Sequence, residues 1–228
     1  MIKCSIIIST KNEKENIHQV IHTIPKSLKS CSEIIVVDAS TDGTDKIAKK
    51  LGAKVISSPP GKGLQMKIGA RVAKGSILVF IDGDGEHPSE KIAEGVKLLN
   101  PCDLVIGDES SYNSFSRFVS GEIGFTDWFL SKTTDLEFQI YCNYPPILSK
   151  DSLNGFRVIR KKDFWRLSLE ADFFEIETEM NLNALEKGFK IKRLALSNVK
   201  RLSGRSKSIL DFVSGIKARK LALARRFN

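Results

Sequence analysis

The hydrophobic positions of this chain form short apolar runs that are separated by stretches of helical spacing. Strand-like runs rich in β-branched residues lie at Lys3–Ser9, Glu33–Val37, Ala53–Ser57, Ser76–Ile81 and Asp103–Ile106. Between these runs, apolar residues recur every three or four positions, as they do on one face of a helix. This alternation predicts βαβ units and therefore a mostly parallel, Rossmann-like sheet with helices on both faces.

The helical stretches between the strand-like runs are Glu13–Leu28, Thr44–Leu51, Leu64–Ala73 and Pro88–Leu99. The alternation then breaks, because Ser110–Lys150 contains aromatic, Gly and Pro residues without a clear period. We expect this segment to be an irregular, partly helical insertion that faces the substrate, since long loops in compact domains are often functional. Regular spacing then returns and predicts two more strands and two more helices, at Gly155–Arg160, Lys162–Leu167, Glu175–Lys187 and Phe189–Leu196.

Polar residues follow several of the strand-like runs directly. In open α/β sheets, ligands bind beyond the carboxyl ends of the strands, so these residues are the first candidates for a functional site. The four segments are Ser9–Glu13, Asp38–Asp42, Asp82–His87 and Gly107–Glu109. The sequence therefore predicts a site at the edge of the sheet where these segments meet.

Three carboxylates follow the fourth strand-like run at alternate positions, Asp82, Asp84 and Glu86. Residues at alternate positions of an extended segment point to the same side, where like charges repel unless a cation lies between them. Hard oxygen ligands of this kind suit Mg²⁺ or Mn²⁺, with diphosphate oxygens and water completing the coordination. The alternative interpretation is a solvated acidic turn.

Two other strand ends carry residues that could contact a nucleoside. Asp38 could accept hydrogen bonds from a nucleobase N–H or a ribose hydroxyl, whereas Asp42 either joins it or caps the next helix. After the first strand-like run, Thr10, Asn12 and Glu13 lie in the same predicted crevice. Asn12 and Glu13 are candidates to hold a ribose, and a helix start is the alternative role for both.

The net charge of +9 is unevenly distributed along the 228 residues. Residues 190–228 contain twelve Lys or Arg and one Asp, a charge of +11, so residues 1–189 sum to 9 − 11 = −2. A nucleic-acid-binding protein that is basic throughout would carry net positive charge along its whole length. Here the net positive charge is confined to the tail of residues 190–228, and we expect no nucleic-acid partner. We predict one domain over residues 1–207 and a basic amphipathic helix over residues 208–228, which either lies on an anionic membrane surface or packs on the domain.

The sequence contains no apolar run near the ~18 residues that argue for a membrane span. The four cysteines lie far apart, without a Cys-x-x-Cys pair, which fits a reducing compartment. We therefore expect a cytoplasmic protein, which contacts the cytoplasmic face of a membrane peripherally if its basic helix lies on that surface rather than on the domain.

The strand-end segments resemble family 2 glycosyltransferases of the GT-A fold, in particular the polyprenyl-phosphate branch that includes dolichyl-phosphate mannose synthases. Residues Asp82–Pro88 match that branch's Asp-x-Asp-x-(Gln or Glu)-His-Pro motif, and Gly61–Gly63 match its Gly-Lys-Gly loop. Val36–Thr44 resemble its Val-Val-Asp-x-Gly-Ser-x-Asp-Gly-Thr segment with one residue fewer. Ser9–Glu13 resemble its Pro-x-x-Asn-Glu-type loop, with Ser in place of Pro.

The resemblance continues downstream and covers roughly residues 2–212. Asp151–Arg157 resemble the branch's Asp-Pro-Thr-Ser-Gly-Phe-Arg segment, and Phe174–Glu177 match its Phe-Glu-Ile-Glu helix start. Ser116–Gly121 resemble its Ser-Arg-Tyr-Val-x-Gly segment, about eight residues later than usual after the fifth strand.

The resemblance implies an inverting glycosyltransferase that uses a UDP- or GDP-sugar and a metal ion, Mg²⁺ or Mn²⁺, held by Asp82, Asp84 and Glu86. Asp82, Asp84 and Arg157 are the expected catalytic residues. Side chains that could clamp phosphates are Arg117, Arg157, Arg205 and Lys207, with solvated surface charges as the alternative interpretation. The complete set of expected substrate contacts is Thr10, Asn12, Glu13, Asp38, Lys62, Arg117, Arg205 and Lys207.

The acceptor decides whether the reaction needs a general base. A sugar hydroxyl needs one, for which Glu175, Glu177 and Glu179 are candidates, whereas a phosphate monoester, with a second pKa of about 6, needs none. The basic tail favours a polyprenyl phosphate at a membrane surface. A soluble or glycan hydroxyl acceptor is the alternative, and a non-catalytic protein that binds through its tail is the alternative of another class. A haloacid-dehalogenase-like phosphatase is disfavoured, because three βα units precede the Asp-x-Asp run.

Overall fold

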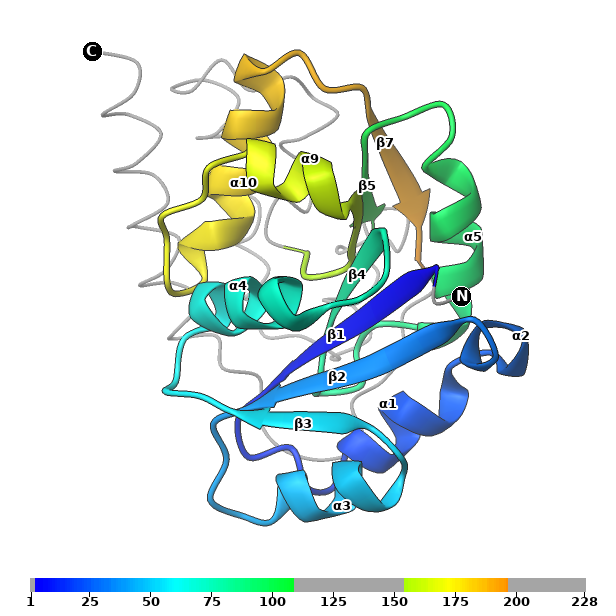
Figure 1. Ribbon diagram of the computed structural model, residues 1–228, viewed down its shortest axis with the longest axis vertical. Coiled ribbons are helices and arrows are strands. Elements are labelled where there is room, and N and C mark those ends of the chain that lie inside the picture. Colours follow the sequence, from blue (N-terminus) through cyan, green and yellow to red (C-terminus); the bar gives the residue numbers. More distant parts are fainter. Residues whose placement is uncertain (1–2, 109–153, 197–228) are drawn as a thin grey trace, which may run out of the picture.

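The computed structural model describes residues 3–108 and 154–196. These residues form one mixed sheet with helices on both of its faces (Figure 1). Several predictions lie outside the described residues, namely those for the 110–150 insertion, Arg117, Arg205, Lys207 and the helix over 208–228.

The described sheet has seven strands in the order β3-β2-β1-β4-β6-β5-β7. All neighbouring pairs are parallel except those of β6, which runs antiparallel to both β4 and β5. The predicted mostly parallel sheet is therefore confirmed. The strands are β1 (Cys4–Thr10), β2 (Ser32–Asp38), β3 (Lys54–Ser57), β4 (Ile77–Asp82), β5 (Leu104–Asp108), β6 (Arg157–Arg160) and β7 (Ile191–Ala195).

Two layers of helices bury the two faces of the sheet in separate hydrophobic cores. Alternate residues of β1 divide between them, because Ile7 packs with one core and Ile6 and Ile8 with the other. One layer consists of α4 (Lys62–Val72), α9 (Lys161–Arg166) and α10 (Glu175–Glu186). The other consists of α1 (Ile17–Thr23), α2 (Lys26–Lys29), α3 (Thr44–Lys50), the 3₁₀ turn η1 (Ser89–Lys91) and α5 (Ile92–Leu98).

The helix predicted over Glu13–Leu28 is two helices in the structure. Ile24, with φ −58° and ψ 124°, leaves the helical region directly before Pro25. The proline ring crowds the residue that precedes it and disfavours a helical conformation there. The apolar spacing continues across the break, which is why the pattern predicted one helix.

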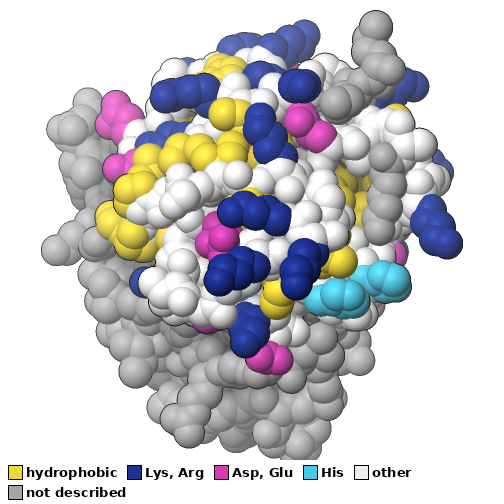
Figure 2. All heavy atoms as spheres, turned by 60° about the horizontal axis from the view of Figure 1, so that its bottom comes forward, with side chains coloured by type: hydrophobic (Ala, Val, Ile, Leu, Met, Phe, Trp, Pro, Cys, Tyr) yellow, Lys and Arg dark blue, Asp and Glu magenta, His cyan; other side chains and the backbone are white. Residues whose placement is uncertain are grey.

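Basic side chains also gather on the outside of the domain. The face in Figure 2 shows many Lys and Arg side chains with few acidic ones between them. Exposed lysines of α3 and β3 include Lys46, Lys49, Lys50 and Lys54. The small net charge of residues 1–189 therefore conceals a locally basic surface.

No helix among residues 3–108 and 154–196 is long and apolar enough to cross a bilayer.

Candidate active site

Three parallel strands bring the predicted strand-end segments together. Strand β1 lies between β2 and β4, with Thr10 in register with Asp38 and Ser9 in register with Asp82. The carboxyl ends of these three strands consequently meet at one edge of the sheet (Figure 1). The site predicted from the sequence is therefore assembled by the topology of β2, β1 and β4.

Asp38 is buried at the end of β2 and held by three hydrogen bonds. The Thr10 and Ser40 hydroxyls each donate to Oδ1 at 2.6 Å, and the Ser40 backbone N–H donates to Oδ2 at 3.2 Å. A carboxylate offers about four acceptor positions, so this network fixes its orientation and leaves capacity for one further donor. An N–H of a nucleobase is a donor of the required kind.

The loops after β1 and β2 are pinned to each other by Asn12. Its backbone N–H donates to the Ser40 hydroxyl at 2.7 Å, and its side-chain oxygen accepts the Thr41 backbone N–H at 2.9 Å. Asn12 has a φ of 57°, in the left-handed region that asparagine tolerates better than most residues. Its oxygen is thus engaged in shaping the loop, and the predicted ribose contact remains a prediction.

Glu13 and Asp42 both support the starts of helices. Glu13 is buried, its side chain accepts from Asn16 at 2.8 Å, and its backbone N–H donates to the Thr44 hydroxyl at 3.0 Å. Asp42 accepts the backbone N–H groups of Thr44 at 3.0 Å and Lys14 at 3.1 Å. The Thr44 hydroxyl also donates to Oδ1 at 2.6 Å. Burial opposes these hydrogen bonds but does not outweigh them, so they hold the pKa of Asp42 below its usual value. The structure favours the helix-start role for Asp42.

The three carboxylates after β4 do not lie along one extended segment, so that prediction was wrong. Strand β4 ends at Asp82, and the chain then turns, with Gly85 at a φ of 83°. Within the turn, the Glu86 backbone N–H donates to Asp84 Oδ1 at 3.1 Å. The strand geometry that was expected to align the side chains therefore stops at the first of them.

The turn nevertheless presents ligands that fit a hard divalent cation. Asp84 and Glu86 are partly exposed on it. Within the described residues, no three His, Cys, Asp or Glu side chains are grouped closely enough to hold a metal ion by themselves. Mg²⁺ is commonly held by only one or two carboxylates, with substrate phosphates and water supplying the other ligands. The donor set therefore fits a metal that binds together with a diphosphate.

Asp82 belongs to a buried charge cluster beneath this turn. Its Oδ2 lies 2.8 Å from Lys62 Nζ, which also lies 2.6 Å from Glu177 Oε1 on α10. Burial would lower the pKa of Lys62, but the two carboxylates outweigh it and raise that pKa above its usual value. Burial also raises the pKa of Glu177, against the opposing effect of Lys62 and Arg157. The cluster therefore joins α4, which carries Lys62, to α10, which carries Glu177.

Arg157, predicted to be catalytic, lies in the floor of this cluster. It is 0% exposed, and its guanidinium donates to Asn181 Oδ1 at 3.1 Å and to the Glu177 carbonyl at 3.4 Å. In this position it supports α10 rather than presenting its charge to a bound phosphate. The geometry therefore gives no support to the predicted phosphate clamp.

The three candidate general bases on α10 have different surroundings. Glu177 is paired with Lys62. Glu179 accepts the backbone N–H groups of Glu170 and Ala171 and so holds the loop before α10. Glu175 is half-buried as a residue, and its Oε2 is itself buried with no hydrogen-bond partner among the described residues. Of the three, Glu175 best fits a free carboxylate.

Gln65 also shapes the site, although the sequence did not single it out. The buried Gln65 amide on α4 donates to the Thr10 carbonyl at 2.9 Å and to the Val37 carbonyl at 3.0 Å. It thereby ties the ends of β1 and β2 together where their ladder stops. The signal in the sequence was a lone amide on the otherwise apolar face of a predicted helix.

Comparisons with known proteins agree with this geometry. Residues 5–167 match the family model of glycosyl transferase family 2. The chain belongs to glycosyl transferase family 2. A dolichol-phosphate mannosyltransferase of Pyrococcus furiosus is 32% identical over 195 residues, covering 78% of this chain and 52% of that protein. A dolichyl-phosphate hexose transferase of Haloferax volcanii is 31% identical over 106 residues, 46% of each chain. This family 2 chain thus spans about half the length of these curated relatives.

Solved structures confirm the GT-A fold of this family 2 member. The glucosyl-3-phosphoglycerate synthase of Mycobacterium tuberculosis, solved with Mn²⁺, UDP and glucosyl-3-phosphoglycerate, superposes with a TM-score of 0.74 at 21% identity. The match covers 98% of this chain and 79% of that one. The mannosyl-3-phosphoglycerate synthase of Rubrobacter xylanophilus gives a TM-score of 0.72 at 21% identity, over 99% and 74% of the two chains.

Proposed function

We propose that this family 2 protein is a metal-dependent, inverting glycosyltransferase that moves a sugar from a nucleoside-diphosphate sugar to a polyprenyl phosphate. Family membership and the dolichyl-phosphate relatives support the reaction class and the acceptor. The Mn²⁺ and UDP of the mycobacterial neighbour belong to that protein, and agree with the donor proposed here. A place at the cytoplasmic face of a membrane, contacted through residues 208–228, is part of the same proposal.

The observation that carries the proposal is the pairing of two acidic features on neighbouring strand ends. Asp38 is an oriented acceptor at the end of β2, and Asp84 and Glu86 lie on the turn after β4. A nucleoside diphosphate carries N–H donors on its base and anionic oxygens at its other end. The site therefore offers an acceptor to the base and, through a metal, a cation to the diphosphate.

The residues of the chain would act mainly by binding and orienting. Asp38, fixed by Thr10 and Ser40, accepts an N–H of the base. Asp84 and Glu86, together with the partly exposed Asp82 carboxylate, would hold Mg²⁺ or Mn²⁺, which supplies positive charge next to the departing diphosphate. An acceptor oxygen forms a bond to the anomeric carbon from one face while the bond to the diphosphate oxygen breaks on the other, so the configuration inverts.

The surroundings of the α10 carboxylates bear on the acceptor. Glu177 and Glu179 are engaged in structural contacts, which fits an acceptor phosphate that already carries its negative charge. The second candidate function, transfer to a hydroxyl, is favoured by the unpartnered Oε2 of Glu175, which could accept the hydroxyl proton. The effect of Glu175→Gln on turnover distinguishes the two acceptors.

Calorimetric titration tests the donor site. UDP, GDP and their common sugar conjugates would be titrated with Mn²⁺ and with EDTA into the wild type, Asp84→Ala and a control, Asp45→Ala. Asp45 is an acid on α3 whose side chain forms an ion pair with Lys49. We expect one nucleotide to bind with Mn²⁺, Asp84→Ala to lose the Mn²⁺ dependence and Asp45→Ala to keep it. Absence of binding by every nucleotide in the presence of Mn²⁺ would contradict the proposal.

A second experiment identifies the acceptor. The protein would be incubated with the sugar conjugate of the nucleotide that binds, and with either a polyprenyl phosphate in detergent or a panel of sugars. A lipid-linked product whose yield is unchanged in Glu175→Gln supports the phosphate acceptor. A product on a sugar hydroxyl, lost in Glu175→Gln, would support the second candidate instead.

A further inference from the structure

Lys62 begins α4 at a point where the backbone is tightly packed. The Gly63 N–H donates to the Phe173 carbonyl at 3.1 Å, and the Leu64 N–H donates to the Asp172 carbonyl at 2.9 Å. A Cβ atom at Gly63 would collide with the Ala171 carbonyl. The first turn of α4 is therefore fixed against the loop that leads into α10, and with it the base of the Lys62 side chain.

The ammonium of Lys62 is surrounded by protein groups. Nζ lies 2.8 Å from Asp82 Oδ2, 2.6 Å from Glu177 Oε1 and 5.6 Å from the centre of the Phe174 ring. An ammonium has three N–H donors, and an aromatic face within about 6 Å is a favourable partner for a cation. Two carboxylates and a ring therefore satisfy Lys62 without any ligand.

The cluster is closed on a further side by Gly155. A Cβ atom built on this glycine would collide with Asp82 Oδ2 and would lie 2.7 Å from Lys62 Nζ and 2.9 Å from His87 Cε1. Side chains larger than hydrogen are thus excluded here by the charge cluster itself. A sugar or phosphate group has no room on this side of the ammonium.

The geometry points to Lys62 as a positioning residue, which fixes the Asp82 carboxylate at the end of β4 and ties that strand to α10 without touching the substrate. This inference rests on the proposed function and replaces the predicted substrate contact of Lys62. Asp82 is the first acid of the turn, and its side chain is 23% exposed. Because Lys62 holds Oδ2, it also determines where the rest of the carboxylate lies relative to Asp84.

A charge-matched double variant separates positioning from folding. Lys62→Met alone leaves Asp82 and Glu177 buried without their shared cation and is expected to fold poorly. Lys62→Met/Glu177→Gln removes one positive and one negative charge, so the net charge of the cluster is that of the wild type. The control is Lys67→Met on the same helix, because Lys67 binds the Glu170 carbonyl and Asp172 outside the cluster.

Three quantities would be measured on each protein: the melting temperature, the Kd of the nucleotide with EDTA and its Kd with Mn²⁺. We expect the double variant to recover most of the melting temperature that Lys62→Met loses, and to bind nucleotide with EDTA as the wild type does. Its gain in affinity on adding Mn²⁺ should fall about tenfold or more, the usual effect of removing a group that orients a metal ligand. Lys67→Met should match the wild type in all three.

Four other outcomes would overturn the inference. A double variant that keeps the full Mn²⁺ gain would overturn the positioning role and leave the proposed function intact. If the double variant binds the nucleotide more weakly by the same factor with EDTA and with Mn²⁺, Lys62 touches the nucleotide. If the double variant is as unstable as Lys62→Met, the role of Lys62 is purely structural. Either result overturns the inference. A wild type that binds no nucleotide would overturn the proposed function and this inference together.

Discussion

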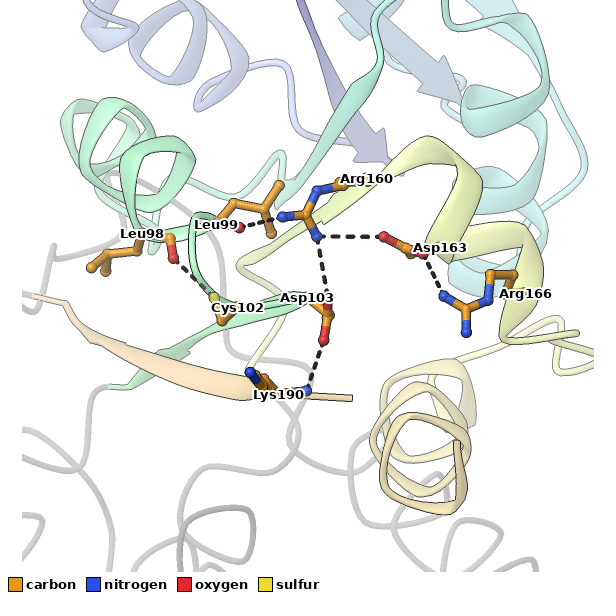
Figure 3. Close-up of polar contacts among 8 residues, drawn as sticks. All are labelled: Leu98, Leu99, Cys102, Asp103, Arg160, Asp163, Arg166 and Lys190. Carbon is orange, nitrogen blue, oxygen red and sulfur yellow. Dashed lines mark hydrogen bonds and ion pairs between the residues drawn. The ribbon is translucent and has the colours of Figure 1, made fainter. Parts of the chain in front are cut away.

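Strand β6 has an arginine at each end, and the two arginines lie in opposite surroundings. Arg157, at the edge of the sheet that carries the site, is 0% exposed and binds Asn181 and the Glu177 carbonyl. Arg160, at the other edge, has a side chain that is 31% exposed. Figure 3 shows its guanidinium binding the Leu99 carbonyl at 2.7 Å, Asp103 at 3.2 Å and Asp163 at 3.5 Å.

The difference shows where this fold buries charge. Desolvation offsets most of the attraction within a buried ion pair, so such pairs are a weak source of stability. The site edge nevertheless buries cations as well as carboxylates, namely Lys62, Arg157 and Glu177. At the opposite edge Asp163 is the only buried residue among the charged residues of Figure 3, and its partners Arg160 and Arg166 lie partly in water. We infer that the buried charges are retained because they fix the positions of site residues, while those at the other edge join chain segments at little cost.

The largest expected effect is the difference in stability lost when Arg157 and Arg160 are each replaced by methionine. Arg157→Met removes a buried cation whose charge favours the ionised form of the buried Glu177, and depriving a buried charge of its counter-charge costs about 3–5 kcal/mol. Arg160→Met removes a partly exposed cation, for which about 1 kcal/mol is expected. Urea unfolding of both variants measures the two free energies. Equal losses would contradict the distinction between the edges, and Arg160→Met should keep the metal-dependent nucleotide binding of the wild type.

The opposite edge also buries a neutral thiol, whose effect depends on pH. Burial raises the pKa of Cys4 to about 12, with smaller contributions from Cys31 and Glu33. Because an unfolded thiol ionises near pH ~8.5, the stability contributed by Cys4 is complete below that pH and is lost as the pH rises towards 12. Relative to Cys4→Ala, the wild type should lose about 1.4 kcal/mol per pH unit above pH ~9. Urea unfolding under reducing conditions at several pH values checks this, and a constant difference would count against it.

Much of the fold followed from the sequence, because the burial pattern of each element is local. The strand-like runs predicted β1 to β5 to within about two residues, and the strand ends predicted which loops meet. The direction of β6 could not be predicted, since apolar alternation is the same in both directions. The break at Pro25 had a signal in the sequence, which the continuing apolar spacing obscured.

The sequence predicted which loops form the site, but not what each side chain does in it. The surroundings of Asp38 follow from residues near strand ends, so the prediction placed it beside the end of the first strand, where the structure has it. The positions of Lys62 and Arg157 depend on how α10 packs, which no local pattern contains. The sequence predicted a substrate contact for Lys62 and a phosphate clamp for Arg157, because sequence alone gives charge without burial.

Salt should change the stability losses of the two arginine variants by different amounts, and this effect is smaller. Mobile ions screen exposed charges, with a Debye length of about 3 Å at 1 M salt, and screen buried pairs much less. The stability loss of Arg160→Met should therefore shrink towards zero in 1 M NaCl, while that of Arg157→Met stays nearly constant. Urea unfolding at low and high NaCl compares them. A salt-independent loss in Arg160→Met would show that its bond to the Leu99 carbonyl matters more than its ion pairs.

The smallest effect is expected at Arg166, whose ion pair with Asp163 is drawn in Figure 3. Its side chain is 63% exposed, lies 2.9 Å from Asp163 Oδ1 and stacks 5.1 Å from the centre of the Phe189 ring. Exposed ion pairs contribute roughly 0–1 kcal/mol, so Arg166→Ala should lower the free energy of unfolding by about 0.5 kcal/mol. Asp163 is buried and keeps Arg160 as a partner, which limits the loss. A loss as large as that of Arg160→Met would mean that Asp163 depends on both arginines, and that this edge also holds a charge cluster which acts as a unit.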